Sequence, residues 1–292
     1  MSLSIKTSKP IWRSMLFVPA HREKFVSKAH EKSADAYILD LEDSVPATEK
    51  QTAREGIVAS AECVSQMGAA AIVRINQELR LAVRDLEACI NPAINGVVIP
   101  KVSNGNQLQQ LCDLIEELET ERCMEIGHTH VIAQIECVDG LANLDNIAQS
   151  TSRLIGMSLG TEDFTASAGM EPTPEGLLAP SQAIVFACRR ASILPFGFPA
   201  SIADYSNLDQ FKETINFARK LGFVGAMCIH PSQIEVLNEA FSPSDTEIEQ
   251  ARAIIAAYEK GLSEGKGAVA FQGTMIDAPV VTRARELLRR FS

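Results

Sequence analysis

The sequence lacks the features that mark secreted and membrane proteins. It contains seven cysteines but no C-x-x-C pair, and an odd number without regular spacing argues against a disulfide framework. No apolar stretch reaches the roughly 18 residues of a membrane-spanning helix. The first ten residues lack the basic and apolar regions of a signal peptide. We therefore expect reduced cysteines, no membrane partner and a cytoplasmic protein.

Basic residues are in the minority. Lysine and arginine number 27 against 37 aspartates and glutamates, which gives a formal net charge of −10. Because non-specific binding of nucleic acid needs a basic surface, we predict no nucleic-acid partner. A small anionic substrate is still compatible, since a local cationic pocket can exist on an acidic protein. With 46% hydrophobic and 22% charged residues, the composition is that of a folded globular protein.

Short apolar runs alternate with segments of helical periodicity. The runs cover Ser14–Pro19, Ala36–Asp40, Ala70–Asn76, Gly96–Val102, His130–Glu136, Arg153–Gly160, Leu194–Ala200 and Gly225–Pro231, and the helical segments include Ala47–Met67, Gln107–Arg122, Gly176–Ile193 and Asn207–Leu221. Continuous apolar character indicates parallel strands buried on both faces. Eight such units predict a (β/α)8 TIM barrel. An open doubly wound sheet is the alternative, although no G-x-G-x-x-G turn follows the first run.

The chain continues beyond the eighth strand. We predict a catalytic barrel over residues 1–242 and a C-terminal helical extension over residues 243–292, which packs on the barrel or on a neighbouring subunit. Within the extension, Pro243–Leu262 is predicted to be a helix with Ser244 as its N-cap. The glycine-rich stretch Gly261–Gly267 follows, and a terminal helix runs through Arg290.

Two of the apolar runs lead directly into a carboxylate. The fifth run ends at Glu136, and Asp163 follows the sixth. Because the carboxyl ends of parallel strands meet at one rim of a barrel, these side chains are expected to lie together. Mg²⁺ binds such carboxylates while it keeps several waters and takes further oxygen ligands from a substrate. The ordinary alternative is that each acid caps the next helix or pairs with a lysine.

Arg74 lies inside a strand between two apolar residues, where an unpaired guanidinium would be costly to bury. Two partners are open: a structural acid such as Asp40, or a substrate carboxylate or carbonyl oxygen bound through the planar guanidinium. We expect Asp40 and Glu42 to face the site and to orient either metal-bound waters or Arg74. Other polar residues also follow the strands: His21, Arg22, Asn76, Lys101, Gln134, Glu162 and His230.

Seven motifs occur in a characteristic order along the chain. They are Leu16-Phe-Val-Pro19 with Arg22, Leu39-Asp-Leu-Glu-Asp43-Ser-Val, Val73-Arg74-Ile-Asn76, Glu136-x-x-x-Gly140, Gly160-Thr-Glu-Asp163 with Gly169, Gly225–His230-Pro231 and Met275-Ile-Asp277-x-Pro279. Together they resemble the citrate lyase β-subunit-like branch of the HpcH/HpaI aldolase superfamily, which includes citramalyl-CoA and malyl-CoA lyases. The resemblance covers essentially the whole chain.

The resemblance implies specific roles at the site. Glu136 and Asp163 would bind Mg²⁺, and Arg74 would bind carboxyl or carbonyl oxygens of the substrate. The loop from Phe17 to Arg22 would contact the thioester. The implied activity is Mg²⁺-dependent cleavage of a 3-hydroxyacyl thioester, of the citramalyl-CoA, malyl-CoA or citryl type, into an acetyl thioester and a 2-oxoacid.

The C-terminal extension carries a further implication of the resemblance. Asp277 matches an aspartate that enters the active site of an adjacent subunit, which implies a homo-oligomer, a trimer, with Asp277 in proton transfer. Ser167 departs from the family pattern, since many relatives have an aspartate there. Three alternatives stay open: a β subunit acting on a citryl-acyl-carrier protein within a larger complex, a metal-dependent aldolase on free 2-oxoacids, and a binding barrel that has lost activity.

Overall fold

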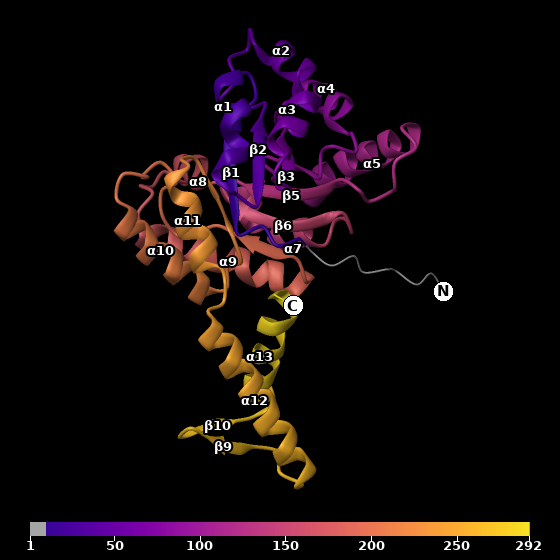
Figure 1. Ribbon diagram of the computed structural model, residues 1–292. Helices are drawn as coiled ribbons and strands as arrows, with labels where there is room; N and C mark the ends of the chain where they lie inside the picture. The colour runs from indigo at the N-terminus through magenta and orange to yellow at the C-terminus, as the bar shows by residue number, and fades with distance from the viewer. Residues whose placement is uncertain (1–9, 292) are drawn as a thin grey trace. The chain divides into compact units, whose positions relative to one another are not determined.

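The computed structural model describes residues 10–291. They form two compact units, one ending at Asn238 and the other beginning at Glu239 (Figure 1). All seven cysteines are free thiols. Within residues 10–291, no helix combines the length and the apolar character needed to cross a bilayer.

The first unit is built on eight parallel strands. They are β1 (Ser14–Pro19), β2 (Ala36–Asp40), β3 (Ala70–Arg74), β4 (Gly96–Ile99), β5 (His130–Ile135), β6 (Leu154–Leu159), β7 (Leu194–Phe196) and β8 (Ala226–Cys228). The sheet order is β7-β6-β5-β4-β3-β2-β1-β8, with every neighbouring pair parallel. Between β7 and β8, Val224 N donates to Pro195 O at 3.1 Å and Gly197 N donates to Gly225 O at 2.9 Å. The predicted (β/α)8 barrel is confirmed.

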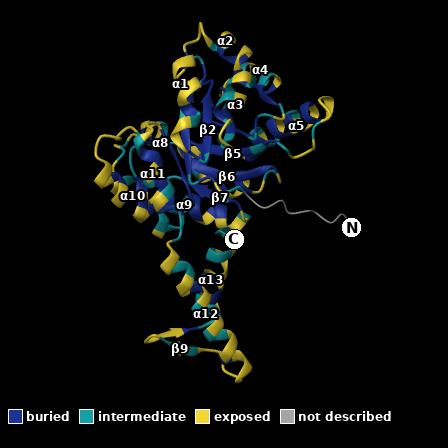
Figure 2. Ribbon diagram, viewed as in Figure 1, coloured by how far each residue is buried: buried dark blue, intermediate teal, exposed yellow. Residues whose placement is uncertain are grey.

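Helices surround these strands. They are α1 (Glu23–Ala29), α2 (Lys50–Glu55), α3 (Ile57–Val64), α4 (Leu79–Cys89), α5 (Gly105–Glu121), α6 (Val138–Ala142), α7 (Leu144–Ala148), α8 (Thr161–Ala168), α9 (Pro174–Ala191), α10 (Leu208–Leu221) and α11 (Ser232–Ala240), with a 3₁₀ turn at His30–Lys32. The strands are dark blue in Figure 2, whereas the outer faces of the helices are largely yellow. The single helix predicted over Ala47–Met67 is wrong: it divides at Gly56, a residue type of low helix propensity.

The side chains inside the barrel change from apolar to polar towards the carboxyl ends of the strands. Ile38, Ile72 and Ile132 belong to one buried apolar cluster. Side chains two residues apart on a strand point to the same face, so each of these isoleucines is followed by an inward-facing polar residue. Those residues are Asp40, Arg74 and Gln134, all of which line a cavity. An apolar core therefore supports a polar layer at the carboxyl ends of the strands.

The second unit contains α12 (Asp245–Ser263), α13 (Ala278–Phe291) and an antiparallel hairpin of β9 (Val269–Phe271) and β10 (Thr274–Ile276). Ser244 caps α12 as predicted, in a reciprocal capping box with Glu247. The hairpin was not predicted, because three-residue strands are too short to show a period-two pattern. Its turn is formed by Gln272 and Gly273, both with positive φ, as tight hairpin turns require.

Candidate active site at the carboxyl ends of the barrel strands

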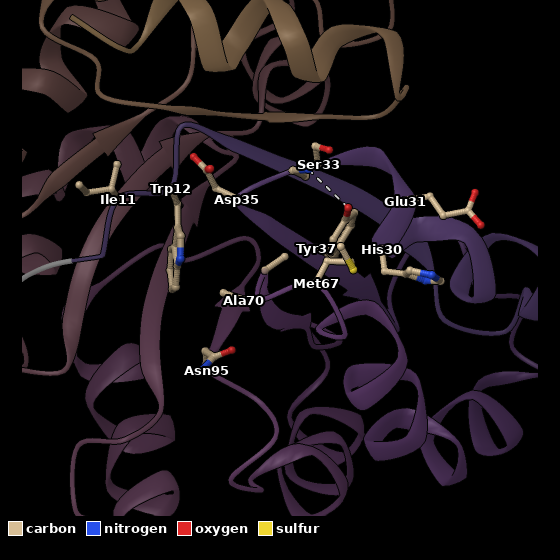
Figure 3. Close-up of a pocket in the computed structure, with 13 residues that line it drawn as sticks. Ile11, Trp12, His30, Glu31, Ser33, Asp35, Tyr37, Met67, Ala70 and Asn95 are labelled. Carbon is tan, nitrogen blue, oxygen red and sulfur yellow. Dashed lines mark hydrogen bonds between the residues drawn. The ribbon is translucent and has the colours of Figure 1, made fainter. Parts of the chain in front are cut away.

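The barrel unit has a cavity at each end. The larger, about 810 Å³, lies at the amino ends of β1 to β4 and is lined by Trp12, Asp35 and Tyr37, among others (Figure 3). Its acid Asp35 is already paired with Arg13 at 2.7 Å. The smaller cavity, about 490 Å³, lies at the carboxyl ends. Barrel enzymes place their catalytic groups at the carboxyl ends, so the smaller cavity is the candidate active site.

The lining of this smaller cavity brings together most of the residues predicted from the sequence. Phe17, Asp40, Arg74, Glu136 and Asp163 all line it. These residues come from β1, β2, β3 and the segments that follow β5 and β6. The fold therefore collects side chains separated by up to 146 positions of sequence around one space.

Arg74 and Asp40 form a bidentate pair across β3 and β2. Arg74 Nε donates to Asp40 Oδ1 at 2.7 Å, and Nη2 donates to Oδ2 at 2.8 Å. Burial acts to raise the pKa of Asp40, but the hydrogen bonds and charge of Arg74 outweigh it and hold that pKa below its ordinary value. The same attraction raises the pKa of Arg74 despite its burial. The structural partner for Arg74, one of the two open alternatives, is therefore present.

The Arg74 side chain also faces the cavity. Its Nη1 lies 3.2 Å from Glu42 Oε2 and 3.8 Å from Asp43 Oδ2. Its guanidinium carbon lies 4.7 Å from the centroid of the Phe17 ring, a cation–π arrangement. Arg74 is thus fixed on one side by acids and an aromatic ring while it still lines the cavity.

Lys101 links an acid that follows β2 to the acids that follow β5 and β6. Its Nζ lies 2.9 Å from Glu42 Oε1 and 3.9 Å from Asp163 Oδ1. Its φ of 50° is in the left-handed region, which is uncommon for a residue with a side chain. Its backbone N donates to Glu136 Oε2 at 2.8 Å. In the sequence, Lys101 stands out only as a polar residue after a strand. Its partners Glu42, Glu136 and Asp163 are at least 35 positions away, so no local pattern indicates these contacts.

Glu136 is held in a narrow space at the end of β5. It is 4% exposed, and a Cβ atom at residue 160 would overlap its Oε1, so a glycine is required there. In the sequence, Gly160 is only part of a motif, and nothing local indicates this close approach. Burial, together with the nearby carboxylates of Glu42 and Asp163, raises the pKa of Glu136 to about 7. Five acids and one arginine line the cavity, so its lining residues carry more negative than positive formal charge.

This donor set fits a Mg²⁺ ion. Glu136 and Asp163 offer carboxylate oxygens to the same cavity, and a bound divalent cation would offset both the burial and the repulsion that raise the pKa of Glu136. Among the described residues, no group of three or more histidine, cysteine or acidic side chains is arranged to enclose a metal. Two carboxylates, completed by water and substrate oxygens, are sufficient for Mg²⁺.

The pKa of Glu136 leads to a testable pH dependence in the metal-free protein. The unfolded chain would have the ordinary value of 4.5, so the folded state binds the proton more tightly. Stability from this group is present below pH 4.5 and is lost as the pH rises through 7. Relative to wild type, Glu136→Gln should gain stability from pH 5 to pH 8, by up to roughly 3 kcal/mol. Urea unfolding in EDTA at both pH values measures the difference, and identical pH profiles would contradict the prediction.

Three other residues singled out from the sequence have different surroundings. Arg22 is exposed at the start of α1 and is not among the residues that line the cavity. Asp277 lies in the second unit, where its Oδ1 accepts a hydrogen bond from Val280 N at 3.4 Å at the start of α13. Ser167 Oγ accepts a hydrogen bond from Val138 N at 3.4 Å.

Comparison with known proteins extends this picture to the whole chain. Residues 13–231 match the model of the HpcH/HpaI aldolase/citrate lyase family. The citrate lyase subunit beta of Escherichia coli (strain K12) is 35% identical over 281 residues, which cover 95% of this chain and 92% of that protein. The L-malyl-CoA/beta-methylmalyl-CoA lyase of Rhodobacter capsulatus is 31% identical over 315 residues, covering 99% of this chain and 98% of that protein.

A solved structure supports the same relationship. The crystal structure of CitE from Mycobacterium tuberculosis in complex with magnesium, acetoacetate and coenzyme A has a TM-score of 0.74 and 30% sequence identity, covering 95% of this chain and 97% of that one. The predicted family and the predicted class of enzyme, a lyase, are both confirmed. The chain belongs to the HpcH/HpaI aldolase/citrate lyase family.

Proposed function

We propose that this protein is a Mg²⁺-dependent carbon–carbon lyase that cleaves a 3-hydroxyacyl thioester into an acetyl thioester and a 2-oxoacid. The observation that carries the proposal is the presence of Glu136 and Asp163 in one cavity beside the anchored Arg74. A hard cation held by two acids, next to a guanidinium, suits a substrate rich in carboxylate and hydroxyl oxygens. The names of the malyl-CoA lyase and citrate lyase relatives agree with this substrate class.

Each residue has a defined part in this reaction. Glu136 and Asp163 would hold the metal, and Gly160 and the backbone of Lys101 fix the Glu136 carboxylate. When bound, Mg²⁺ polarises the substrate oxygens and acidifies the hydroxyl group. Arg74 is oriented in advance by Asp40, so it can stabilise negative charge on the developing 2-oxo oxygen without reorganising.

The bond changes balance as follows. A base removes the proton of the substrate hydroxyl, the carbon–oxygen double bond of the 2-oxoacid forms, and the carbon–carbon bond breaks. Its electron pair stays on the acetyl thioester carbon, which then takes up a proton. We propose Asp277 of an adjacent subunit for proton transfer in a homotrimer, because it lies in the smaller C-terminal unit rather than in the barrel.

A second candidate follows from the relatives. One relative is named citrate lyase subunit beta, so the second candidate is a β subunit that acts on a citryl-acyl-carrier protein within a larger complex. The two candidates share the barrel chemistry and differ in the carrier of the thioester. They predict different behaviour of the isolated chain.

One experiment tests the proposal and separates the candidates. Purified protein is incubated with citramalyl-CoA, malyl-CoA and citryl-CoA, with Mg²⁺ or with EDTA, and acetyl-CoA is measured. A free acyl-CoA lyase should cleave at least one thioester, and EDTA should abolish the reaction. If no CoA thioester is cleaved but citryl-acyl-carrier protein is, the subunit function is favoured. Turnover that persists undiminished in EDTA would contradict the metal-dependent mechanism.

A further inference from the structure

A buried polar network lies outside the active-site cavity, where α2 and α4 meet the segment that follows β3. Its members are Lys50, Arg54, Asn76 and Asp85, and we call these four residues the outer clamp. Lys50 and Arg54 are four positions apart on α2, so they project from the same face of that helix. Asp85 lies on α4, which runs beside α2 (Figure 1). None of the four is among the residues that line the cavity.

The acid at the centre of the outer clamp is completely buried. Asp85 is 0% exposed, and its Oδ1 accepts a hydrogen bond from Arg54 Nε at 2.8 Å. Its Oδ2 accepts hydrogen bonds from Asn76 N at 2.8 Å and from Asn76 Nδ2 at 2.6 Å. Apolar residues of similar volume often stabilise a fold as well as such a buried ion pair does. The pair and its hydrogen bonds do, however, fix the Asn76 amide in one orientation, with Oδ1 directed at Lys50.

Lys50 connects the outer clamp to the loop that follows β2. Its Nζ donates to Asn76 Oδ1 at 2.5 Å, to Leu41 O at 2.9 Å and to Glu42 O at 2.8 Å, which uses all three donors of an ammonium group. The two carbonyl oxygens belong to the peptide groups on either side of the Glu42 Cα. Because one ammonium group holds both, the direction in which the Glu42 side chain leaves the backbone is fixed.

Glu42 in turn contacts two cationic side chains of the site. It is 5% exposed, its Oε1 lies 2.9 Å from Lys101 Nζ, and its Oε2 lies 3.2 Å from Arg74 Nη1. Arg74 lines the cavity, and the backbone N of Lys101 donates to Glu136 Oε2 at 2.8 Å. A shift of Glu42 would therefore disturb both the guanidinium that faces the cavity and the segment that holds the Glu136 carboxylate.

We propose that Lys50 is a positioning residue of the active site, which acts through Glu42 to hold the Arg74 guanidinium in its productive direction. The inference rests on the proposed function, in which Arg74 stabilises charge on the developing 2-oxo oxygen. Lys50 does not line the cavity, so its effect on the reaction passes through these intermediate residues. A guanidinium oriented in advance avoids reorganisation during the reaction. Misplacing such a group by about 1 Å can lower the rate roughly a hundredfold.

Oxalate tests this positioning without turnover, because its second carboxylate places negative charge where the 2-oxo oxygen would develop it. Oxalate and pyruvate are titrated calorimetrically into the Mg²⁺-loaded protein. Lys50→Met should lower the affinity for oxalate about tenfold or more and that for pyruvate less than about threefold. In thioester cleavage, kcat should fall about tenfold or more while KM changes less than about threefold. Lys220→Met, in the exposed last turn of α10, is the matched control and should keep both affinities.

A double-mutant cycle separates positioning from general support of the fold. In the Glu42→Gln background, Lys50→Met should lower the affinity for oxalate by less than about twofold further, since the carboxylate through which Lys50 acts is already gone. Two independent losses would instead multiply. Urea unfolding of wild type, both single variants and the double variant measures the change in stability separately.

The outcomes decide the role of Lys50 separately from the lyase activity. The inference is overturned if folded Lys50→Met binds oxalate as wild type does, if the two substitutions act independently, or if wild type binds no oxalate. Lys50→Gln, which keeps only a shorter donor, provides the test if Lys50→Met does not fold. If the oxalate affinities follow the expected pattern but no thioester is cleaved, the positioning role of Lys50 stands and the proposed lyase function fails.

Discussion

Glu136→Gln is expected to lower Mg²⁺-dependent thioester cleavage by roughly 10³-fold or more while the protein stays folded. The glutamine has nearly the same volume and can still accept the hydrogen bond from Lys101 N. It loses the negative charge that holds the cation. Removing that charge also removes the cost of burying it and the repulsion from Glu42 and Asp163, which together raise the pKa of Glu136. Steady-state kinetics over a range of Mg²⁺ concentrations, together with circular dichroism and urea unfolding, measures both effects.

Asp163→Asn is the companion variant and should give a loss of similar size, because Asp163 is the second proposed ligand. Its side chain is 45% exposed, so the substitution should change stability little. Glu175→Gln, in the exposed first turn of α9, is the matched control and should keep wild-type activity. If either site variant kept near-normal rates with excess Mg²⁺, the assignment of that residue as a metal ligand would be wrong.

Arg74→Met is expected to lower the free energy of unfolding by about 3–5 kcal/mol and to reduce cleavage more than a hundredfold. The substitution removes the cation from three acids at once: Asp40, which is 1% exposed, and Glu42 and Asp43 beside it. A buried carboxylate without a partner is costly, and this cost dominates the stability change. Urea unfolding and steady-state kinetics of the variant give the two values.

A second substitution separates the two roles of Arg74. In Asp40→Asn/Arg74→Met the buried charge is gone from both sides, so most of the lost stability should return. Activity should not return, because no guanidinium remains to stabilise the substrate oxygen. Arg74→Lys keeps a positive charge but not the planar, two-point contact. Its free energy of unfolding and its rate of cleavage should both lie between those of wild type and Arg74→Met. Recovery of activity in the double variant would show that Arg74 acts only as the partner of Asp40.

The sequence predicted the barrel well because buried parallel strands leave a clear pattern. β1 and β2 have the predicted bounds, and the predicted run at Ala70–Asn76 differs from β3 only at its end. The predicted run extends two residues beyond β3 because it continues to the polar residue Asn76, which follows the strand. The division of the predicted helix at Gly56 was missed because the helical segment was extended across this glycine despite its low helix propensity.

Site residues could be predicted from the sequence where a charged residue lies in or just after an apolar, strand-like run. Glu136, Asp163 and Arg74 met that condition, and all three line the cavity. The parts that depend on contacts between distant segments were not predictable. The left-handed backbone of Lys101 and the close approach of Gly160 to Glu136 are of this kind. No local pattern encodes them, because each depends on where another strand ends.

The junction between β7 and β8 affects where the barrel around the pocket can open locally. Asp40 and Arg74 stand on strands joined by ladders of five register pairs, as are β5 and β6, which precede the proposed metal ligands. In contrast, β7 and β8 are three residues each, and the two backbone hydrogen bonds described above join residues at or beside their ends. Phe198 and Ile229, which follow these short strands, also line the cavity. Because few backbone hydrogen bonds close the barrel here, local opening should begin on the side of Phe198 and Ile229 and not at the strands that carry Asp40 and Arg74.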